Sequence, residues 1–237
     1  MLRSLKEAWS LFSKRPRIRI SNVDYNAYWE VKRDGNFGTL NHYQINRIEW
    51  IADRIEPGDT VLDMGCGDGA AIMALAKLIK ISALAADIAE KPLEFLNSQG
   101  IRAIKCDLLN LTDVVQLPVC DHVLLLEVIE HFRDAEALIQ AALTRAGKAL
   151  FFSVPNTGYF PYRLRLLSGR FPAQWRTHPG EHLRFWTVAD MKWWLQELGL
   201  DQYCEIHCYQ GLPILNKIMP GFFAAAMVVR IDKRRLS

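Results

Sequence analysis

A short glycine-rich stretch is the first part of this sequence that could bind a ligand. It is the run Asp63-Met64-Gly65-Cys66-Gly67-Asp68-Gly69, which follows a short apolar segment and precedes a helical pattern. Glycine tolerates positive φ angles and lets a ligand approach the backbone closely. The N–H groups at the start of the expected helix favour a carboxylate. Because the glycine spacing is G-x-G-x-G, it differs from the dinucleotide pattern G-x-G-x-x-G.

Acidic residues end the next three apolar runs. Asp87 stands where a carboxylate can accept hydrogen bonds from both hydroxyls of a ribose. Asp107 can accept a hydrogen bond from an adenine amino group, and Glu127 faces the same crevice. Each of these acids alone could be a helix cap or a solvated loop residue. Their repetition at successive strand ends, together with the glycine loop, favours a nucleoside cofactor.

Glu127-Val128-Ile129-Glu130-His131 places two carboxylates and an imidazole at the end of a buried strand. One interpretation is a site for Mg²⁺, which prefers oxygen ligands. Another is that His131 is a general base, since an imidazole with an ordinary pKa of about 6.5 suits proton removal from a hydroxyl. His178 or His182 could take the same role, and a helix-capping role for His131 stays open.

Strand and helix patterns alternate from residue 59 to residue 155, which predicts right-handed βαβ units. We expect a doubly wound α/β fold with a mostly parallel seven-stranded sheet and helices on both faces. The expected strands are 60–63, 81–87, 101–106, 121–126, 148–154, 203–210 and 224–232. Residues 156–186 interrupt the alternation and are interpreted as a flap, before a helix at 187–198. We expect residues 1–20 to form a basic helix and an extended segment, and 21–237 to form the main domain.

The composition is that of a globular protein. The chain has 237 residues, of which 50% are hydrophobic and 23% charged, with a net charge of +3. This charge is too small to indicate nucleic-acid binding. Five cysteines without a C-x-x-C pair fit free thiols in a reducing cytoplasm. We find no secretory signal, and the apolar region 212–229 is interrupted by polar residues and Pro220.

Residues 1–19 carry six basic residues against Glu7 alone. Apolar side chains recur there at helical spacing, at Leu2, Leu5, Trp9 and Phe12. This segment could lie on an anionic membrane surface as a peripheral contact. The favoured alternative is a helix that packs over the cofactor site or is solvated. A second basic stretch, 163–176, has four arginines and no acid. The oligomeric state is left open.

The loop and the acidic residues together resemble the class I S-adenosylmethionine-dependent methyltransferases, over roughly residues 40–200. That resemblance implies S-adenosylmethionine as the cofactor. It also implies a set of cofactor-binding residues: Asp63, Gly65, Cys66, Gly67, Asp87, Ile88, Asp107, Leu108 and Glu127.

Two more local resemblances concern the chemistry at the acceptor. The E-x-x-E-H stretch resembles that of ubiquinone-biosynthesis O-methyltransferases and small-RNA 2′-O-methyltransferases, which implies a metal site. Its ligands would be Glu127, Glu130, His131 and, from the flap, His182. The flap itself, with Pro155-Asn156 and the run 163–172, resembles the W-type proteins of methionine biosynthesis.

The leading functional hypothesis is methyl transfer to an oxygen nucleophile on a small molecule. The catalytic candidates are His131, Glu127 and His182. The flap residues expected to shape the acceptor pocket are Tyr159, Phe160, Arg163, Arg165, Arg170 and Trp175. The W-type resemblance supports an alternative, a cofactor-binding partner that regulates an acyltransferase. RNA 2′-O-methylation is a third hypothesis, disfavoured because no RNA-binding domain is visible.

Overall fold

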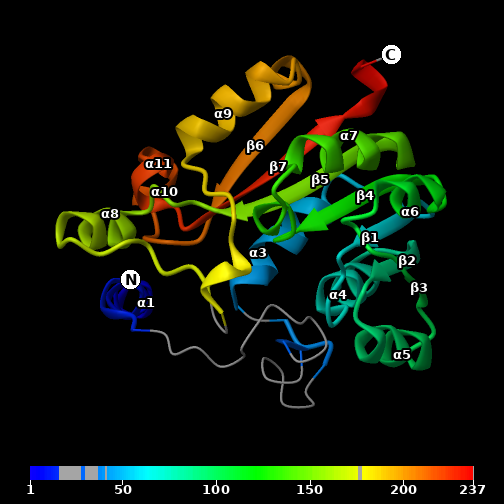
Figure 1. Ribbon diagram of the computed structural model, residues 1–237, viewed down its shortest axis with the longest axis horizontal. Coiled ribbons are helices and arrows are strands. Elements are labelled where there is room, and N and C mark those ends of the chain that lie inside the picture. Colours follow the sequence, from blue (N-terminus) through cyan, green and yellow to red (C-terminus); the bar gives the residue numbers. More distant parts are fainter. Residues whose placement is uncertain (16–27, 30–36, 41, 176–177, 237) are drawn as a thin grey trace.

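A twisted seven-stranded sheet forms the middle of the molecule (Figure 1). The computed structural model describes residues 1–15, 28–29, 37–40, 42–175 and 178–236. The strands are β1 (Thr60–Met64), β2 (Ser82–Asp87), β3 (Arg102–Lys105), β4 (Cys120–Leu126), β5 (Ala146–Pro155), β6 (Cys204–Tyr209) and β7 (Ala226–Asp232). Their order is β3-β2-β1-β4-β5-β7-β6, and β7 alone runs antiparallel to its neighbours β5 and β6.

Helices cover both faces of this sheet. One face carries α3 (His42–Ala52), α4 (Ala70–Leu78) and α5 (Glu90–Ser98). The other carries α6 (Leu111–Gln116), α7 (Ala135–Arg145) and α9 (Val188–Glu197). The remaining helices are α1 (Leu2–Ser13), α8 (Phe160–Leu167), α10 (Leu215–Ile218) and α11 (Pro220–Phe223). Short 3₁₀ turns include η1 (Ile129–His131) and η2 (Pro179–Glu181). The doubly wound α/β fold expected from the sequence is therefore confirmed.

Strand β4 shows why the sheet is buried on both sides. Val123 and Leu125 pack into the core cluster under α7 and α9. Leu124 and Leu126 pack into the opposite cluster, under α3 and α4. Successive side chains of a strand point to opposite faces, so a strand covered on both sides must be apolar at every position. This requirement explains the almost continuous apolar run of β4.

The expected strands and helices agree with the structure to within one or two residues at most boundaries. Four helices were not expected: α6, which follows Asp107, α8, which lies inside the flap, and the short α10 and α11 between β6 and β7. The helix expected near the start of the chain is present as α1, whereas the extended segment at 16–20 lies outside the described residues. Of the helices in the described parts of the chain, none is long and apolar enough to cross a membrane.

Candidate functional site

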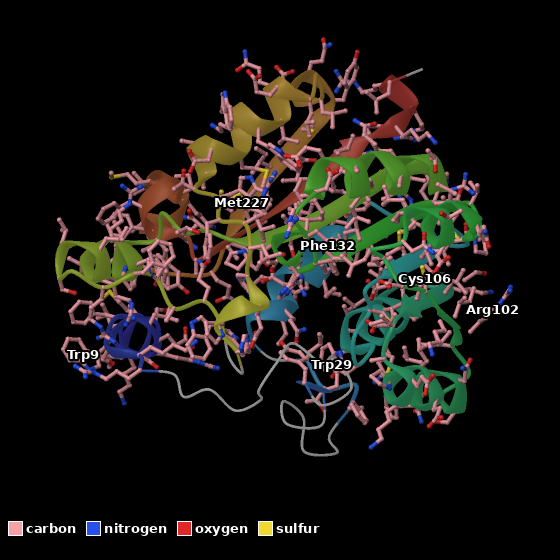
Figure 2. All side chains as sticks on the ribbon, viewed as in Figure 1. Trp9, Trp29, Arg102, Cys106, Phe132 and Met227 are labelled. Atoms are coloured by element: carbon pink, nitrogen blue, oxygen red, sulfur yellow. The ribbon has the colours of Figure 1, made fainter. Side chains whose placement is uncertain are left out.

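A cavity of about 390 Å³ opens at the edge of the sheet where β1, β2 and β4 end. Its volume lies within the usual range of about 300–1,000 Å³ for small-molecule sites. Eight of the nine residues proposed to hold the cofactor line this cavity: Asp63, Gly65, Cys66, Asp87, Ile88, Asp107, Leu108 and Glu127. Trp29 and Phe132, both labelled in Figure 2, also line it. The structure thus gathers residues from four strand ends around one space, as expected for a doubly wound sheet.

The glycine loop between β1 and α4 has a backbone that other residues could not adopt without strain. Gly65 and Gly67 have φ angles of 71° and 53°. A Cβ atom on Gly67 would lie 2.0 Å from the ring of Trp29, and one on Gly65 would lie 2.7 Å from Val128. The Gly67 N–H donates to Oδ2 of Asp87 at 2.8 Å and so ties the loop to the end of β2. Gly67 itself is not among the described residues that line the cavity.

Asp63 is a buried acid of the site with a strongly raised pKa. Its side chain is 1% exposed, and its Oδ2 atom has no hydrogen-bond partner among the described residues. Burial, together with the nearby carboxylates of Asp87 and Asp68, raises the pKa of Asp63 to about 7, although the Arg47 guanidinium opposes the shift. A buried acceptor without a hydrogen bond is energetically costly. A ligand that donates a hydrogen bond to Oδ2 of Asp63 would remove this cost.

Asp87 and Asp107 are held by the backbone around them. The two carboxylate oxygens of Asp87 accept N–H bonds from Gly67 and Ala89 at 2.8 and 2.9 Å. Oδ1 of Asp107 accepts the N–H of Leu109 at 2.9 Å, and Asp107 is partly buried. Since a carboxylate oxygen can accept more than one hydrogen bond, both side chains remain able to receive ligand hydroxyls or amines.

Glu127 is positioned by a hydrogen-bond network that joins three elements. Its φ angle is 60°, which is unusual for a residue other than glycine. Ser153 of β5 donates to Oε1 of Glu127 at 2.8 Å, and Arg47 of α3 donates to the same atom at 3.2 Å. Arg47 also donates to the Ser153 hydroxyl at 2.7 Å. Glu127 therefore lies on the cofactor side of the cavity, beside a buried arginine.

A second group of cavity-lining side chains consists of Glu130, His131 and His182. We call their side of the cavity the acceptor side, because the methyl acceptor is expected there. One ligand atom from each of the three lies within 4.8 Å of the others. The rings of His131 and His182 meet edge to face, with centroids 4.8 Å apart. Glu127, proposed as a fourth metal ligand, is not in this group of described residues and is held by Arg47 and Ser153 instead.

Backbone hydrogen bonds bring the flap to this group. The Glu130 carbonyl oxygen accepts the N–H groups of Leu183 and Arg184 at 2.8 and 3.1 Å. Nδ1 of His131 is hydrogen-bonded to the carbonyl oxygen of Glu181. These bonds fix His182 beside His131 although the two residues are far apart in the sequence. His178 caps η2 through its own side chain and is not among the described residues that line the cavity.

The flap arginines have structural roles that differ from the expected ones. Arg165 is 4% exposed and donates from Nη1 to the carbonyl oxygens of Phe12 and Lys14. Arg170 donates to the same Lys14 carbonyl, and Arg163 donates to Gly158. None of the three is among the described cavity-lining residues, and neither are Tyr159, Phe160 and Trp175. Tyr162 and Gln174 line the cavity from the flap instead.

Arg47 is the main site residue that the sequence analysis did not identify. It is 2% exposed, and its Nε atom has no hydrogen-bond partner among the described residues. It precedes the buried Ile51 by one helical turn, so it lies on the core-facing side of α3. A cation on the buried face of an amphipathic helix was the available signal. Its guanidinium is suited to a carboxylate.

These groups fit the cofactor implied by the sequence. S-adenosylmethionine carries an ammonium group, a carboxylate, a ribose and an adenine. Asp63 offers a buried acceptor for the ammonium, and Arg47 offers a buried cation for the carboxylate. Asp87 and Asp107 end β2 and follow β3, where a ribose and an adenine would be recognised.

Comparison with known proteins agrees with this assignment. Residues 39–205 match the model of a family described as "Methyltransferase domain". A ubiquinone biosynthesis O-methyltransferase of Xanthomonas axonopodis pv. citri is 27% identical over 185 residues, which cover 74% of this chain and 76% of that protein.

Solved structures share the fold at lower identity. A SAM-dependent methyltransferase from Archaeoglobus fulgidus superposes with a TM-score of 0.60 and 16% identity, covering 88% of this chain and all of that one. Magnesium protoporphyrin IX methyltransferase from Synechocystis PCC 6803, with bound SAH, gives a TM-score of 0.54 and 18% identity, covering 97% and 94% of the two chains. With the family match over most of the chain, the protein belongs to the methyltransferase domain family and is a class I S-adenosylmethionine-dependent methyltransferase.

Proposed function

We propose that this methyltransferase acts on an oxygen atom of a small-molecule acceptor and that His131 accepts the proton of the attacking hydroxyl. The observation that carries the proposal is the position of His131, which lines the same cavity as the cofactor loop and is fixed by the Glu181 carbonyl. Relatives named as ubiquinone biosynthesis O-methyltransferases support an oxygen acceptor. Those relatives are named as enzymes, which disfavours the regulatory alternative.

The contact with Glu181 determines which nitrogen of His131 can act as a base. A carbonyl oxygen only accepts hydrogen bonds, so Nδ1 of His131 must carry a proton. In the neutral imidazole the lone pair is then on Nε2. This tautomer is the one required of a general base whose other nitrogen is held by the protein.

Residues on the two sides of the cavity would have different roles. Bound S-adenosylmethionine supplies a methyl group on a positively charged sulfur. Asp63 and Arg47 would hold its amino-acid part, and Asp87 its ribose. His131 would take the acceptor proton on Nε2 as the acceptor oxygen forms its new bond to carbon. Correct placement of two reactants can contribute about 7–11 kcal/mol.

A metal site is a second candidate for the group on the acceptor side. Glu130, His131 and His182 offer one carboxylate and two imidazoles close together. Imidazole suits Zn²⁺ better than Mg²⁺, and a carboxylate also suits Mn²⁺, so we propose Zn²⁺ or Mn²⁺ for this donor set rather than the Mg²⁺ expected from the sequence. The two proposals exclude each other at His131, because an Nε2 atom bound to a metal cannot accept a proton.

The test combines a turnover assay with a metal titration. Release of S-adenosylhomocysteine is measured with a panel of phenols, catechols and hydroxybenzoates, and the corresponding aromatic amines serve as matched controls. Turnover confined to the oxygen compounds supports the proposal, and turnover confined to the amines contradicts it. If the activity with an oxygen acceptor disappears after chelation and returns with Mn²⁺ or Zn²⁺, the metal role replaces the base role. Unchanged activity after chelation supports the base.

Two further proposals concern the chain as a whole. Residues 156–186 would be the part that selects the acceptor, because they contribute Tyr162, Gln174 and His182 to the cavity. All five cysteines are free thiols, which supports a reducing compartment such as the cytoplasm. Fractionation of cells that carry a tagged protein tests the location.

A further inference from the structure

Helix α1 leaves three of its large apolar side chains in solvent. The side chains turned inward are those of Ser4, Glu7, Ala8, Leu11 and Phe12, which are buried or partly buried. The outward apolar residues are Leu2, which is 77% exposed, Leu5 at 44% and Trp9 at 67%. Figure 2 shows Trp9 at the outer edge of the molecule, beyond α1. Packing within the protein therefore does not account for these three apolar residues.

In helix α8, which contacts α1, the usual arrangement of buried apolar and exposed charged side chains is inverted (Figure 1). Its arginine Arg165 is buried, whereas Leu164, Leu166 and Leu167 are 44%, 50% and 84% exposed. Phe171, just beyond the helix, is 63% exposed. The inversion arises because Arg165 turns inward to donate to two carbonyl oxygens at the C-terminal end of α1. Its leucine neighbours are consequently left on the outside.

The charges around these apolar side chains are almost all positive. We call the exposed parts of residues 1–15 and 160–171 the α1–α8 surface. These two segments contain seven basic residues and one acid, Glu7, which is itself paired with Arg3 at 3.1 Å. Lys6, Arg15 and Arg163 are exposed. An apolar patch surrounded by cations is complementary to a surface that is both apolar and anionic.

We propose that the α1–α8 surface docks on an anionic lipid bilayer. Apolar side chains on this surface would enter the boundary between headgroups and acyl chains. The Lys and Arg side chains would be attracted to the anionic headgroups. A second copy of the chain would carry the same positive charge, so the charge pattern disfavours self-association. Leu11 of α1 and Tyr162 of α8 also line the cavity, so docking would place the acceptor site close to the bilayer.

Vesicle flotation of the full chain tests docking without any acceptor, so its outcome does not depend on the proposed function. The vesicles contain phosphatidylcholine alone or phosphatidylcholine with 30% phosphatidylglycerol. We expect the wild-type chain to float with the anionic vesicles and to be released by high salt. The double variant Trp9→Ser/Leu167→Ser should bind at least tenfold more weakly. The matched control Trp193→Ser/Leu78→Ser removes residues of similar exposure, 60% and 58%, on α9 and α4, and should float like wild type.

The outcomes separate a bilayer from other partners. Thermal unfolding of each variant checks that it is folded, because exposed Leu→Ser and Trp→Ser changes should leave the melting temperature nearly unchanged. Arg3→Gln/Lys6→Gln should weaken binding to anionic vesicles while its binding to neutral ones stays low. A wild-type chain that does not float, or a Trp9→Ser/Leu167→Ser variant that floats as well as the control, overturns the proposal. A dimer in sedimentation velocity that Trp9→Ser/Leu167→Ser abolishes, without vesicle binding, would assign the surface to a second copy instead.

Discussion

Nδ1 of His131 is hydrogen-bonded to the backbone carbonyl oxygen of Glu181, and this contact joins the end of β4 to the flap. The same bond sets the tautomer of the imidazole, because a carbonyl can only accept. One hydrogen bond thus links the position of the flap to the basicity of the proposed catalytic nitrogen. A change that displaces the flap should therefore alter both acceptor binding and proton transfer.

Replacing His131 by Asn should reduce turnover without unfolding the protein. The amide of Asn can still donate to the Glu181 carbonyl, but it has no basic nitrogen at the position of Nε2. Loss of a general base costs about 10²–10⁴-fold in rate. The expected result is a lower kcat with a cofactor Kd close to wild type, measured by product release and calorimetry. His178→Asn is the control, because His178 is not among the described cavity-lining residues and Asn can also cap η2; equal losses in both variants would contradict the role of His131.

Binding of the cofactor should release a proton at neutral and mildly acidic pH. Asp63 has a pKa of about 7, raised first by burial, and a cationic ammonium group beside it would favour its ionised form. Affinity should therefore weaken as pH falls below about 7, up to tenfold per pH unit. Calorimetry at pH 6.5 in two buffers of different ionisation enthalpy measures the released proton. Asp63→Asn should bind more weakly and release none, whereas a proton count unchanged by this substitution would rule Asp63 out.

The same carboxyl should make the ligand-free protein less stable at alkaline pH. Its folded-state pKa of about 7 is above the ordinary aspartate pKa of 3.8, so the folded protein holds this proton more tightly than the unfolded chain. Its contribution to stability therefore falls as pH rises from about 4 to 7 and is constant above, with a limit of about 4 kcal/mol. Asp63→Asn should melt several degrees above wild type at pH 8 and close to wild type at pH 4. Asp87→Asn, which loses acceptor strength toward two backbone N–H groups, should not gain stability.

Replacing Arg47 by Met should weaken cofactor binding more than it weakens the fold. Hydrogen bonds to charged groups contribute about 1.5–3 kcal/mol each, which corresponds to about a 10- to 150-fold change in Kd. Arg54 lies in the turn just after α3 and contacts Glu205 and Trp50 rather than the cavity, so Arg54→Met is the matched control. Calorimetric titration with S-adenosylhomocysteine measures both variants. An Arg47→Met variant that binds like Arg54→Met would show that Arg47 holds only Glu127 and Ser153.

Replacing Arg165 by Met should release α1 from the flap. The buried guanidinium donates to the last carbonyl groups of α1, and loss of these bonds removes the contacts that fix the helix end. Limited trypsin digestion should then cut within residues 1–15 much faster than in wild type. Arg163→Met is the control, because Arg163 bonds Gly158 within its own segment. Equal digestion of the two variants would indicate that other contacts hold α1, among them the bonds from Lys14 to the carbonyls of Ala173 and Trp175.

The sheet could be predicted from the sequence because its determinants are local. The apolar run Val123–Leu126 of β4 and the glycines after β1 each have one dominant physical interpretation. The positions of Asp87 and Asp107 at strand ends then follow from the parallel arrangement, and the class I methyltransferase fold predicted from them is confirmed.

Contacts between distant segments could not be predicted in this way. Arg47 is a site residue because α3 folds against the ends of β4 and β5. Its place on the buried face of α3 is the only sign of this in the sequence, and it does not show which strands the helix meets. The flap arginines were predicted to face the acceptor, but Arg165 and Arg170 bond the carbonyls that end α1. A buried arginine between exposed leucines contradicts the usual rule that leucines are inside. Only the partner helix explains it.

The arginine-capped end of α1 has a consequence for protein engineering. A flap transplanted from another methyltransferase would change the residues around the methyl acceptor. It would also remove Arg165, the donor to the carbonyl oxygens of Phe12 and Lys14. A graft of residues 1–15 alone would strand Arg165 as a buried charge. Chimeras that exchange acceptor preference should therefore transplant residues 1–15 and 156–186 together, as one discontinuous cassette.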